Sequence, residues 1–287
     1  PKPDGGTRKL GIPTVLDRFV QQAIAQQLTL VFDPKFSEFS YGFRPNRRAH
    51  TAVKQARAYI KEGSLYVVDM DLEKFFDKVN HDRLMAKLAN EIKDKALLRL
   101  IRSFLQAGVL ENGLVRPITE GTPQGGPLSP LLSNIVLDEL DKELEKRGHK
   151  FVRYADDFQI YVKSERAGER VMESITMFIE KKLRLKVNLE KSTIDRPWKR
   201  KFLGFSFTSN KKQPKIRLAK QSIERFKVRI RKLTSRKQQI AMEQRIAKLN
   251  SYLNGWLGYY QLIETPSKLK ELESWLHRRL RMIRWKE

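Results

Sequence analysis

The sequence contains no cysteine, which excludes disulfide bridges and thiolate metal sites. It has no apolar run near the roughly 20 residues that a membrane-spanning helix needs, and no signal peptide is visible. These absences predict a cytoplasmic protein without a membrane partner. The chain begins at Pro1 rather than at a methionine, so we expect a processed or trimmed sequence.

Acidic residues are scarce relative to basic ones. The formal net charge is +25, from 58 Lys and Arg against 33 Asp and Glu. Residues 196–287 hold 25 of the basic and 6 of the acidic residues, a net +19, which leaves +6 for residues 1–195. A surface this basic attracts polyanions by counterion release, and nucleic acid is the commonest such partner. Acidic lipids are the alternative, but the amphipathic stretches carry too many core residues for a surface-lying helix.

Two adjacent carboxylates stand in residues 151–162, FVRYADDFQIYV. Two β-favouring runs flank a short turn with Asp156 and Asp157, which predicts a hairpin. Neighbouring like charges repel, so both side chains must stay in water or be neutralised by a cation. A solvated turn would look the same, because Asp is a common turn residue.

A second pair of acids follows another predicted strand, residues 65–70. Strand alternation places Asp69 and Asp71 on one face, so periodicity does not select between them. Carboxylates that converge from two strands, without His or Cys, suit a hard cation such as Mg²⁺. Two such ions activate a 3′ hydroxyl and neutralise a leaving pyrophosphate. Together with the basic carboxy-terminal part, this pattern predicts nucleotidyl transfer on a nucleic acid.

Periodicity predicts the other elements of an α+β protein. A glycine-rich stretch, residues 121–134, runs into an apolar helix, with Ser129 as N-cap, Pro130 at the first helical position and Gly148 at the far end. Helices are predicted from residue 14 to Pro34, over residues 49–61, over residues 82–106 and near residues 167–182, and hairpins over residues 1–13 and 108–118.

The pattern changes after Asn210. Apolar residues then recur at helical spacing in three stretches, with breaks near Ser235 and Pro266. We expect a helical bundle with Trp256 and Trp275 in its core. The domain boundary is therefore predicted near Asn210, with domains at residues 1–210 and 211–287.

The motifs resemble, in order and spacing over essentially the whole chain, those of the reverse transcriptases that bacterial group II introns encode, the maturases. The matching stretches are PKPDGGTRKLGIP, SYGFRPNRRAH, VDMDLEKFFDKVNHD, GTPQGGPLSPLLSN, RYADDF, LKVNLEKS, FLGF and GWLGYY. The resemblance implies a right-hand polymerase: fingers and a palm with an antiparallel sheet in residues 1–210, and an α-helical, RNA-binding thumb in residues 211–287. The implied activity is RNA-directed DNA polymerase, with assistance to intron splicing.

The resemblance also assigns the metal ligands. In that family the metal-binding aspartate lies five residues before an aromatic residue that blocks a ribose 2′ hydroxyl. This selects Asp71, makes Phe76 the steric gate and leaves Asp69 structural. Leu72 would lend a backbone carbonyl to a metal ion, and Asp156 would be the second main ligand, with Asp157 as a weaker partner. The implied cofactor is a pair of Mg²⁺ ions, for which Mn²⁺ can substitute.

Other positions match residues that handle the substrates. Lys2 and Arg8 match positions that hold the incoming triphosphate, and Gln124 lies in the loop that lines its sugar. Lys191 matches a general acid for pyrophosphate, although a solvated lysine fits as well. The implied partners are intron RNA, an RNA template with a DNA primer, and dNTPs; the oligomeric state stays open.

Two further stretches are expected to contact nucleic acid. Aromatic and basic residues alternate in residues 40–48, which favours contact through Arg44 and Arg47, although a loop pinned by buried aromatic side chains would look the same. The stretch Phe202, Leu203, Gly204 and Phe205 resembles the primer grip, and a core role is also compatible.

Departures from the family pattern limit what is implied. We expect the chain to lack the family's amino-terminal extension and a DNA-binding or endonuclease segment after Glu287, so primer extension is expected more than retrohoming. The alternatives are a splicing cofactor that binds RNA without catalysis, and a related enzyme recruited to a host role such as CRISPR spacer acquisition or DNA repair. We expect a bacterial protein associated with RNA or the nucleoid.

Overall fold

The computed structural model describes residues 11–107, 109–111, 114–116, 120–122, 125–238 and 240–284. The chain divides into two compact units, one of Pro1–Ala52 with Tyr66–Ile194 and one of Val53–Leu65 with Asp195–Glu287. No helix of the described part is long and apolar enough to cross a membrane.

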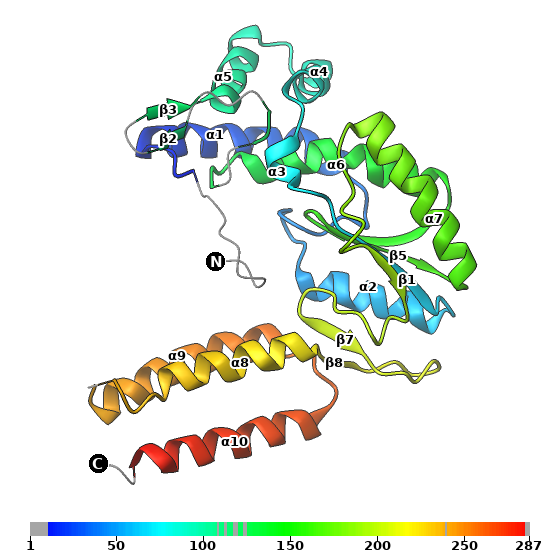
Figure 1. The fold of residues 1–287 in the computed structure, drawn as a ribbon. Coiled ribbons are helices and arrows are strands. Elements are labelled where there is room, and N and C mark those ends of the chain that lie inside the picture. Colours follow the sequence, from blue (N-terminus) through cyan, green and yellow to red (C-terminus); the bar gives the residue numbers. More distant parts are fainter. Residues whose placement is uncertain are drawn as a thin grey trace. The chain divides into compact units, whose positions relative to one another are not determined.

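A sheet in the order β4-β5-β1-β6 forms the centre of the first unit (Figure 1). Its strands are β1 (Tyr66–Met70), β4 (Lys150–Tyr154), β5 (Asp157–Val162) and β6 (Thr193–Asp195). β5 pairs antiparallel with β4 on one side and with β1 on the other. The hairpin predicted over residues 151–162 is confirmed, and its turn consists of Ala155 and Asp156.

One face of this sheet packs on helices α6 (Ser129–Lys146) and α7 (Glu165–Phe178). Register places Val68 opposite Ile160, and both side chains are fully buried in the main apolar core with residues of α6 and α7. Gly168 of α7 lies so close that an added Cβ would meet the side chains of Val68 and Val162. Because side chains alternate along a strand, Asp69 belongs to the opposite face.

Further helices and helical turns belong to the first unit. They are α1 (Val15–Phe32), the 3₁₀ turn η1 (Asp33–Lys35), α3 (Phe75–Lys78), α4 (His81–Glu91), α5 (Lys95–Gln106) and the π-helical turn η2 (Ile179–Leu183). The single helix predicted over residues 82–106 is instead two, because Asp94 accepts hydrogen bonds from the Ala96 and Leu97 amides and starts α5 anew. The hairpin predicted over residues 108–118 is present as β2 (Val109–Glu111) and β3 (Leu114–Arg116).

The ends of α6 show one correct and one wrong prediction. Gly148 has φ 70° and ends the helix with two hydrogen bonds, from its own amide to the Glu145 carbonyl and from His149 to Leu144. The prediction that Ser129 is the N-cap was wrong: the helix begins at Ser129, and Leu128 occupies the cap without a side-chain bond. Leu128 and Ser129 are both buried, so packing rather than a capping side chain accompanies the start of the helix.

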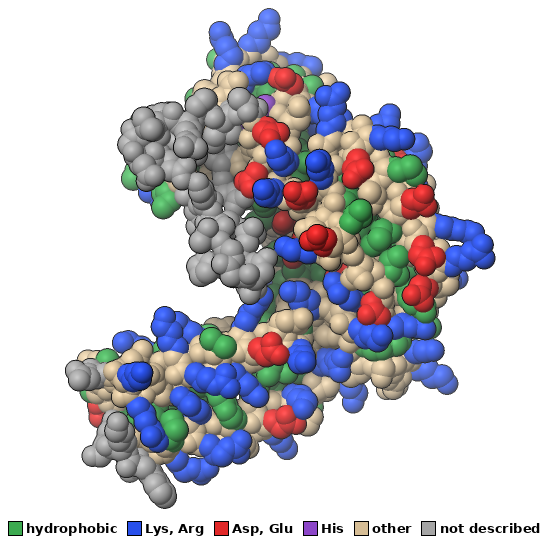
Figure 2. All heavy atoms as spheres, in the orientation of Figure 1, with side chains coloured by type: hydrophobic (Ala, Val, Ile, Leu, Met, Phe, Trp, Pro, Cys, Tyr) green, Lys and Arg blue, Asp and Glu red, His purple; other side chains and the backbone are tan. Residues whose placement is uncertain are grey.

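The second unit contains the three helices predicted after Asn210. They are α8 (Lys220–Leu233), α9 (Met242–Tyr260) and α10 (Pro266–Arg284) (Figure 1). The helices share an apolar core, against which the partly buried Trp256 and Trp275 pack. The hairpin of β7 (Phe205–Phe207) and β8 (Ile216–Leu218) and most of α2 (Ala49–Lys61) belong to the same unit. Figure 2 shows Lys and Arg side chains spread over these helices.

Candidate active site

The first predicted acid, Asp71, directly follows β1. The segment after η2 holds its backbone: the Asn188 amide donates to the Asp71 carbonyl at 2.8 Å, and the Asp71 amide donates to the Ser192 hydroxyl at 3.1 Å. Leu72 forms an isolated antiparallel bridge with Val187. The Asn188–Asp71 hydrogen bond lies beside this bridge and does not use the Leu72 carbonyl. That carbonyl oxygen therefore remains a candidate metal ligand.

The second acidic pair lies at the tip of the β4–β5 hairpin. Asp156 occupies the turn and is half-buried, whereas Asp157 begins β5 opposite Tyr154 and is exposed. Ala155, the first turn residue, has φ 59°, a left-handed value that glycine adopts more easily. The turn packs on the Gly42 backbone, where an added Cβ would lie 2.3 Å from the Ala155 nitrogen. A contact with a distant segment therefore determines where the turn carries Asp156.

The sheet register brings the two acidic segments to the same end of the sheet. Met70, the last residue of β1, pairs with Phe158. Asp71 follows Met70 and Asp157 precedes Phe158, so the two acidic segments lie at the same end of the sheet. Because side chains alternate, Asp157 of β5 belongs to the face opposite to the core formed with α6 and α7.

The electrostatics of Asp71 show that several predicted residues act on one another. Burial raises the pKa of the Asp71 carboxyl, the positive charge of Lys191 opposes the rise, and the negative charges of Asp156 and Asp69 add to it. A hydrogen bond with the Asn188 side chain also opposes it. The net direction is upward, mainly because burial disfavours the charged carboxylate.

Lys191 lies in the turn that follows Asn188, and its amide donates to the Asn188 carbonyl at 3.2 Å. Its side chain is exposed, and its charge reaches Asp71. Both the general-acid role and a solvated lysine are compatible with this position, so the role stays a prediction.

Phe76 stands on the short helix α3, five residues after Asp71. It is half-buried, with its ring edge-on to Phe75 at 5.2 Å between centroids. The Thr122 amide donates to the Phe76 carbonyl at 2.6 Å. The start of the glycine-rich stretch is therefore fixed to α3. Gln124 in the same stretch, like Lys2 and Arg8, lies outside the described residues.

Arg44 is held inside the first unit. Its side chain is only 5% exposed and pairs with the Asp33 carboxylate at 2.7 Å, while its guanidinium also donates to the carbonyls of Asp33, Ser37 and Ser40. These bonds occupy the guanidinium with protein acceptors, which favours the alternative of a pinned loop for this residue. Arg47 is half-buried, donates to the Glu38 carbonyl at 3.0 Å and lies over the Tyr41 ring.

The stretch from Phe202 to Phe205 forms a tight turn in the second unit. The two phenylalanines exchange both backbone hydrogen bonds at 2.9 Å, and both are buried. Leu203 and Gly204 between them have φ 51° and 83°, as a type I′ turn requires. The Tyr259 hydroxyl donates to the Leu203 carbonyl at 2.9 Å. The phenylalanine rings are core residues, and only the half-buried turn is left for contact with nucleic acid.

Several residues that support the acids were missed by sequence reasoning. Asn188 and Ser192 hold Asp71, and Gly42 supports the turn before Asp156. The signal for Asn188 and Ser192 was their position in the motif LKVNLEKS, which also contains Lys191. Arg153 carried a clearer signal, because alternation places it on the core side of β4 together with Phe151.

The oxygen donors at this site fit a hard cation. Asp71 and Asp156 supply carboxylates, and Leu72 a carbonyl, which are ligand types that Mg²⁺ prefers. Within the described ranges, no group of three or more His, Cys, Asp or Glu residues that could hold a metal ion is present. Mg²⁺ commonly uses one or two protein carboxylates plus substrate phosphates, so a third acid is not required.

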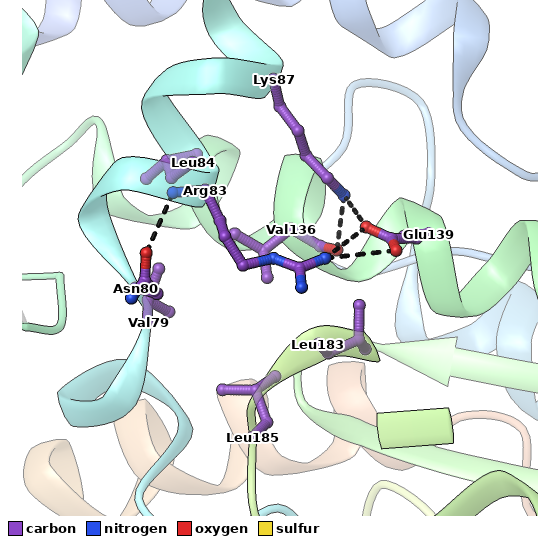
Figure 3. A pocket seen from close by; sticks show the side chains of 9 residues that line it. All are labelled: Val79, Asn80, Arg83, Leu84, Lys87, Val136, Glu139, Leu183 and Leu185. Carbon is purple, nitrogen blue, oxygen red and sulfur yellow. Dashed lines mark hydrogen bonds and ion pairs between the residues drawn. The ribbon is translucent and has the colours of Figure 1, made fainter. Parts of the chain in front are cut away.

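A small pocket elsewhere in the first unit is a poor substrate site. It has a volume of about 10 Å³ and lies between α4, α6 and the residues after α7 (Figure 3). Arg83 and Lys87 both pair there with Glu139, at 3.3 and 2.8 Å. This volume suits about one water molecule, and no lining residue belongs to the predicted site.

Two family models match the chain. Residues 1–207 match the model described as reverse transcriptase (RNA-dependent DNA polymerase). The chain belongs to this reverse transcriptase family. Residues 223–287 match the group II intron, maturase-specific domain, which confirms the resemblance to the maturases.

Curated relatives of this reverse transcriptase point the same way. The chain is 32% identical over 232 residues to Protein YkfC of Escherichia coli, which covers 68% of this chain and 61% of that protein. It is 32% identical over 263 residues to the group II intron-encoded protein LtrA of Lactococcus lactis, covering 69% of this chain and 44% of that protein. The chain thus spans about half the length of the curated relatives it matches.

Solved structures support the fold of this reverse transcriptase. Apo telomerase from Candida tropicalis matches with a TM-score of 0.55 at 14% identity, over 75% of this chain and 44% of that one. Telomerase from Candida albicans, solved with a fragment of telomeric RNA, matches with a TM-score of 0.53 at 15% identity, over 86% and 47%. At this identity the likeness concerns the fold, and it confirms the predicted right-hand α+β architecture.

Proposed function

We propose that this chain is an RNA-directed DNA polymerase of the group II intron type, with Asp71 and Asp156 as its main metal ligands. The observation that carries the proposal is that the sheet brings these two acids, 85 residues apart in sequence, to the same end: Met70, next to Asp71, pairs with Phe158, and the β4–β5 turn at that end contains Asp156. Carboxylates that converge from two strands suit a hard cation.

In this proposal each residue of the site has a defined task. Asp71, Asp156 and the Leu72 carbonyl hold the metal ions, with Asp157 as a weaker ligand. The chemistry that two bound Mg²⁺ or Mn²⁺ ions supply is activation of the primer 3′ hydroxyl and neutralisation of the leaving pyrophosphate. Lys191 donates a proton to pyrophosphate.

Substrate selection belongs to other residues of the same proposal. Phe76 excludes the ribose 2′ hydroxyl, Gln124 lines the sugar, and Lys2 and Arg8 hold the triphosphate. Fingers and palm comprise residues 1–210, and a thumb of residues 211–287 binds template RNA and intron RNA.

The second candidate is a splicing cofactor that binds intron RNA without catalysis. The match of residues 223–287 to the maturase-specific domain and the basic charge of this region favour RNA binding. The two functions differ in their need for the acids, because RNA binding alone does not require Asp71 or Asp156.

Primer extension on an RNA template, with and without Mg²⁺, tests the proposal. Asp156→Ala is expected to lower cDNA synthesis at least about 1000-fold, since a lost metal ligand removes several kcal/mol of charge stabilisation. RNA affinity should stay unchanged. The matched control is Asp82→Ala, at an exposed aspartate of α4 that pairs with Arg102, and it should keep wild-type synthesis. Full-length cDNA from Asp156→Ala would contradict the assignment.

A further inference from the structure

Arg153 is a charged residue that is fully buried on the face of the sheet that packs against the core. It stands on β4, three residues before Asp156. Register places it opposite Phe158, on the face that packs against α6. Burial of a charge there is costly, and well-packed apolar residues often serve stability as well or better. We therefore expect Arg153 to have a role other than packing.

All five N–H donors of the Arg153 guanidinium have acceptors. Nε and one terminal nitrogen bind the two Asp141 carboxylate oxygens at 2.7 and 2.5 Å. The same terminal nitrogen donates to the Ser40 hydroxyl at 2.7 Å. The other donates to the Asn134 side-chain oxygen at 2.9 Å and to the Ala155 carbonyl at 3.0 Å. The side chain therefore connects α6, the segment at Ser40 and the hairpin turn.

The bond to Ala155 acts on the peptide group that Ala155 shares with Asp156. Ala155 adopts φ 59°, a conformation that costs a non-glycine residue free energy and persists where surrounding contacts impose it. The hydrogen bond from the Arg153 guanidinium to the Ala155 carbonyl is one such contact. The guanidinium is planar and rigid. Its two hydrogen bonds to the Asp141 carboxylate therefore determine the direction of its hydrogen bond to Ala155.

The other partners also fix this turn. The Asn134 amide donates to the Gly42 carbonyl at 2.9 Å, and the Gly42 backbone is the surface on which the turn packs. The backbone of Arg153 pairs with the same segment, donating to Phe39 at 2.9 Å and accepting from Tyr41 at 2.8 Å. One buried network therefore holds both the turn and the segment beneath it.

We propose that Arg153 is a positioning residue for Asp156: its buried guanidinium, oriented by Asp141, fixes the Ala155 carbonyl and with it the turn that presents the Asp156 carboxylate. This inference rests on the proposed role of Asp156 as a metal ligand. Arg153 does not touch substrate in this scheme; it acts through the backbone of the turn.

Hydrogen–deuterium exchange of the full chain, without metal or substrate, tests the positioning directly. The variant is Arg153→Lys, which keeps the charge for Asp141 but lacks the fork that reaches Ala155. We expect amides of residues 155–157 to exchange about threefold to tenfold faster, the range that one hydrogen bond is worth. Amides of β1 should stay at wild-type rates. Equal acceleration in β1 would indicate general destabilisation and overturn the proposal.

Primer extension separates a positioning role from a structural one. For Arg153→Lys we expect kcat to fall about 10-fold to 100-fold, since misplacement of a catalytic group by about 1 Å costs this much. KM for dNTP should be unchanged, and the Mg²⁺ concentration for half-maximal rate should rise. The control is Arg147→Lys, at an arginine that pairs with Glu143 on the surface of α6; it should match wild type in both experiments.

Wild-type exchange at residues 155–157 in folded Arg153→Lys, or wild-type kcat and Mg²⁺ dependence, would overturn the proposal. If that variant does not fold, Ser40→Ala decides, because it removes only the hydroxyl that binds the guanidinium. It should raise exchange at residues 155–157 about threefold, and no change would count against the proposal. A wild-type chain without primer extension would refute the proposed function instead, and the exchange experiment would still test the network.

Discussion

At the scale of single residues, Asp71 is the position where most interactions of the site meet. Its backbone is bonded on both sides, to Asn188 and Ser192, so its location does not depend on a bound ligand. Its carboxyl has a raised pKa, with burial as the largest cause and the charges of Asp156 and Asp69 adding to it. A carboxylate carried by a backbone that the protein itself holds in place is the arrangement expected of a preorganised ligand.

Phe76 gives a test of sugar selection at the same scale. Phe76→Ala removes the ring proposed to block a ribose 2′ hydroxyl, so incorporation of ribonucleotides relative to dNTPs should rise at least about 10-fold, as a lost steric contact of 1 to 3 kcal/mol implies. Competition between the two nucleotides in primer extension measures this ratio.

The control for Phe76→Ala is Phe178→Ala. Phe178 is also a half-buried phenylalanine packed on the main core, at the end of α7. It should lose stability through the same removal of volume and leave sugar selection unchanged. If the ratio stays at the wild-type value in Phe76→Ala, the gate lies elsewhere.

At the scale of elements, the hairpin that carries Asp156 depends on a glycine from another segment. An added Cβ at Gly42 would lie 2.3 Å from the Ala155 nitrogen and 2.9 Å from the Tyr154 carbonyl carbon. Both are backbone atoms, so the turn must move if a side chain is present. Gly42 is therefore required by close approach rather than by its own φ.

Gly42→Ala is accordingly expected to lower stability by about 1–3 kcal/mol, as overpacking does, and to lower kcat up to about 100-fold by displacing the turn. Thermal unfolding and primer extension measure the two effects. Gly258→Ala serves as control, because an added Cβ in that stretch of α9 meets nothing within 4 Å. Unchanged kcat in folded Gly42→Ala would show that the turn tolerates displacement.

Glu264, between α9 and α10, contacts two elements of the second unit. It accepts from the Ile216 amide of β8 at 2.8 Å and from Arg57 of α2 at 2.7 Å. Burial by itself raises the pKa of Glu264, but these hydrogen bonds and the charges of Arg57 and Lys215 outweigh it and lower the pKa below its usual 4.5. A carboxylate with a lowered pKa stabilises the fold above the unfolded-state pKa and loses this effect as pH falls through the folded-state pKa.

Glu264→Gln should therefore be less stable than wild type at pH 7 by at most about 1 kcal/mol, since the pair is largely exposed. The difference should shrink as pH falls below about 4.5. Denaturant unfolding at several pH values measures it, with Glu271→Gln, at an exposed ion pair of α10, as control. A difference independent of pH would mean that hydrogen bonding without charge accounts for the contact.

At the scale of the whole molecule, the excess positive charge lies mainly in the carboxy-terminal part. Residues 196–287 carry +19 of the total +25, and many Lys and Arg side chains are spread over the visible face of α8 to α10 (Figure 2). Their apolar stripes are used in the helical core. Exposed basic residues of these helices that lie outside this core, such as Lys220, Arg225 and Lys232, suit phosphate contacts.

Replacement of Lys220, Arg225 and Lys232 of α8 by Gln tests this surface. RNA affinity should fall, and the slope of log K against log salt should decrease by up to about 2, since each lost contact with single-stranded phosphate contributes about 0.7. Filter binding at several salt concentrations measures the slope.

The matched control replaces three exposed basic residues of the first unit, Arg166, Arg170 and Lys181. It removes the same charge from α7 and the turn after it. An equal loss of slope in both triple variants would mean that net charge, rather than the α8 surface, determines RNA binding.

The sequence by itself determined the local elements, the family motifs and the uneven charge. Helix and strand periodicity and the αL glycine at Gly148 depend on neighbouring residues, so pattern was sufficient for them. Pattern was insufficient for the ends of helices where local signals compete, as at Ser129 and Asp94. Strand alternation also placed Asp69 and Asp71 on the same face, so it did not select the candidate metal ligand.

Only the tertiary structure decided which distant residues act together. The register of β1 against β5 brings Asp71 to the hairpin of Asp156, and the segment after η2 fixes the Asp71 backbone. Likewise, packing alone distinguishes the buried arginines, Arg44 and Arg153, from the solvent-exposed ones that contribute charge. The physical reason is that pairing and burial depend on contacts between segments far apart in the chain, which no local pattern records.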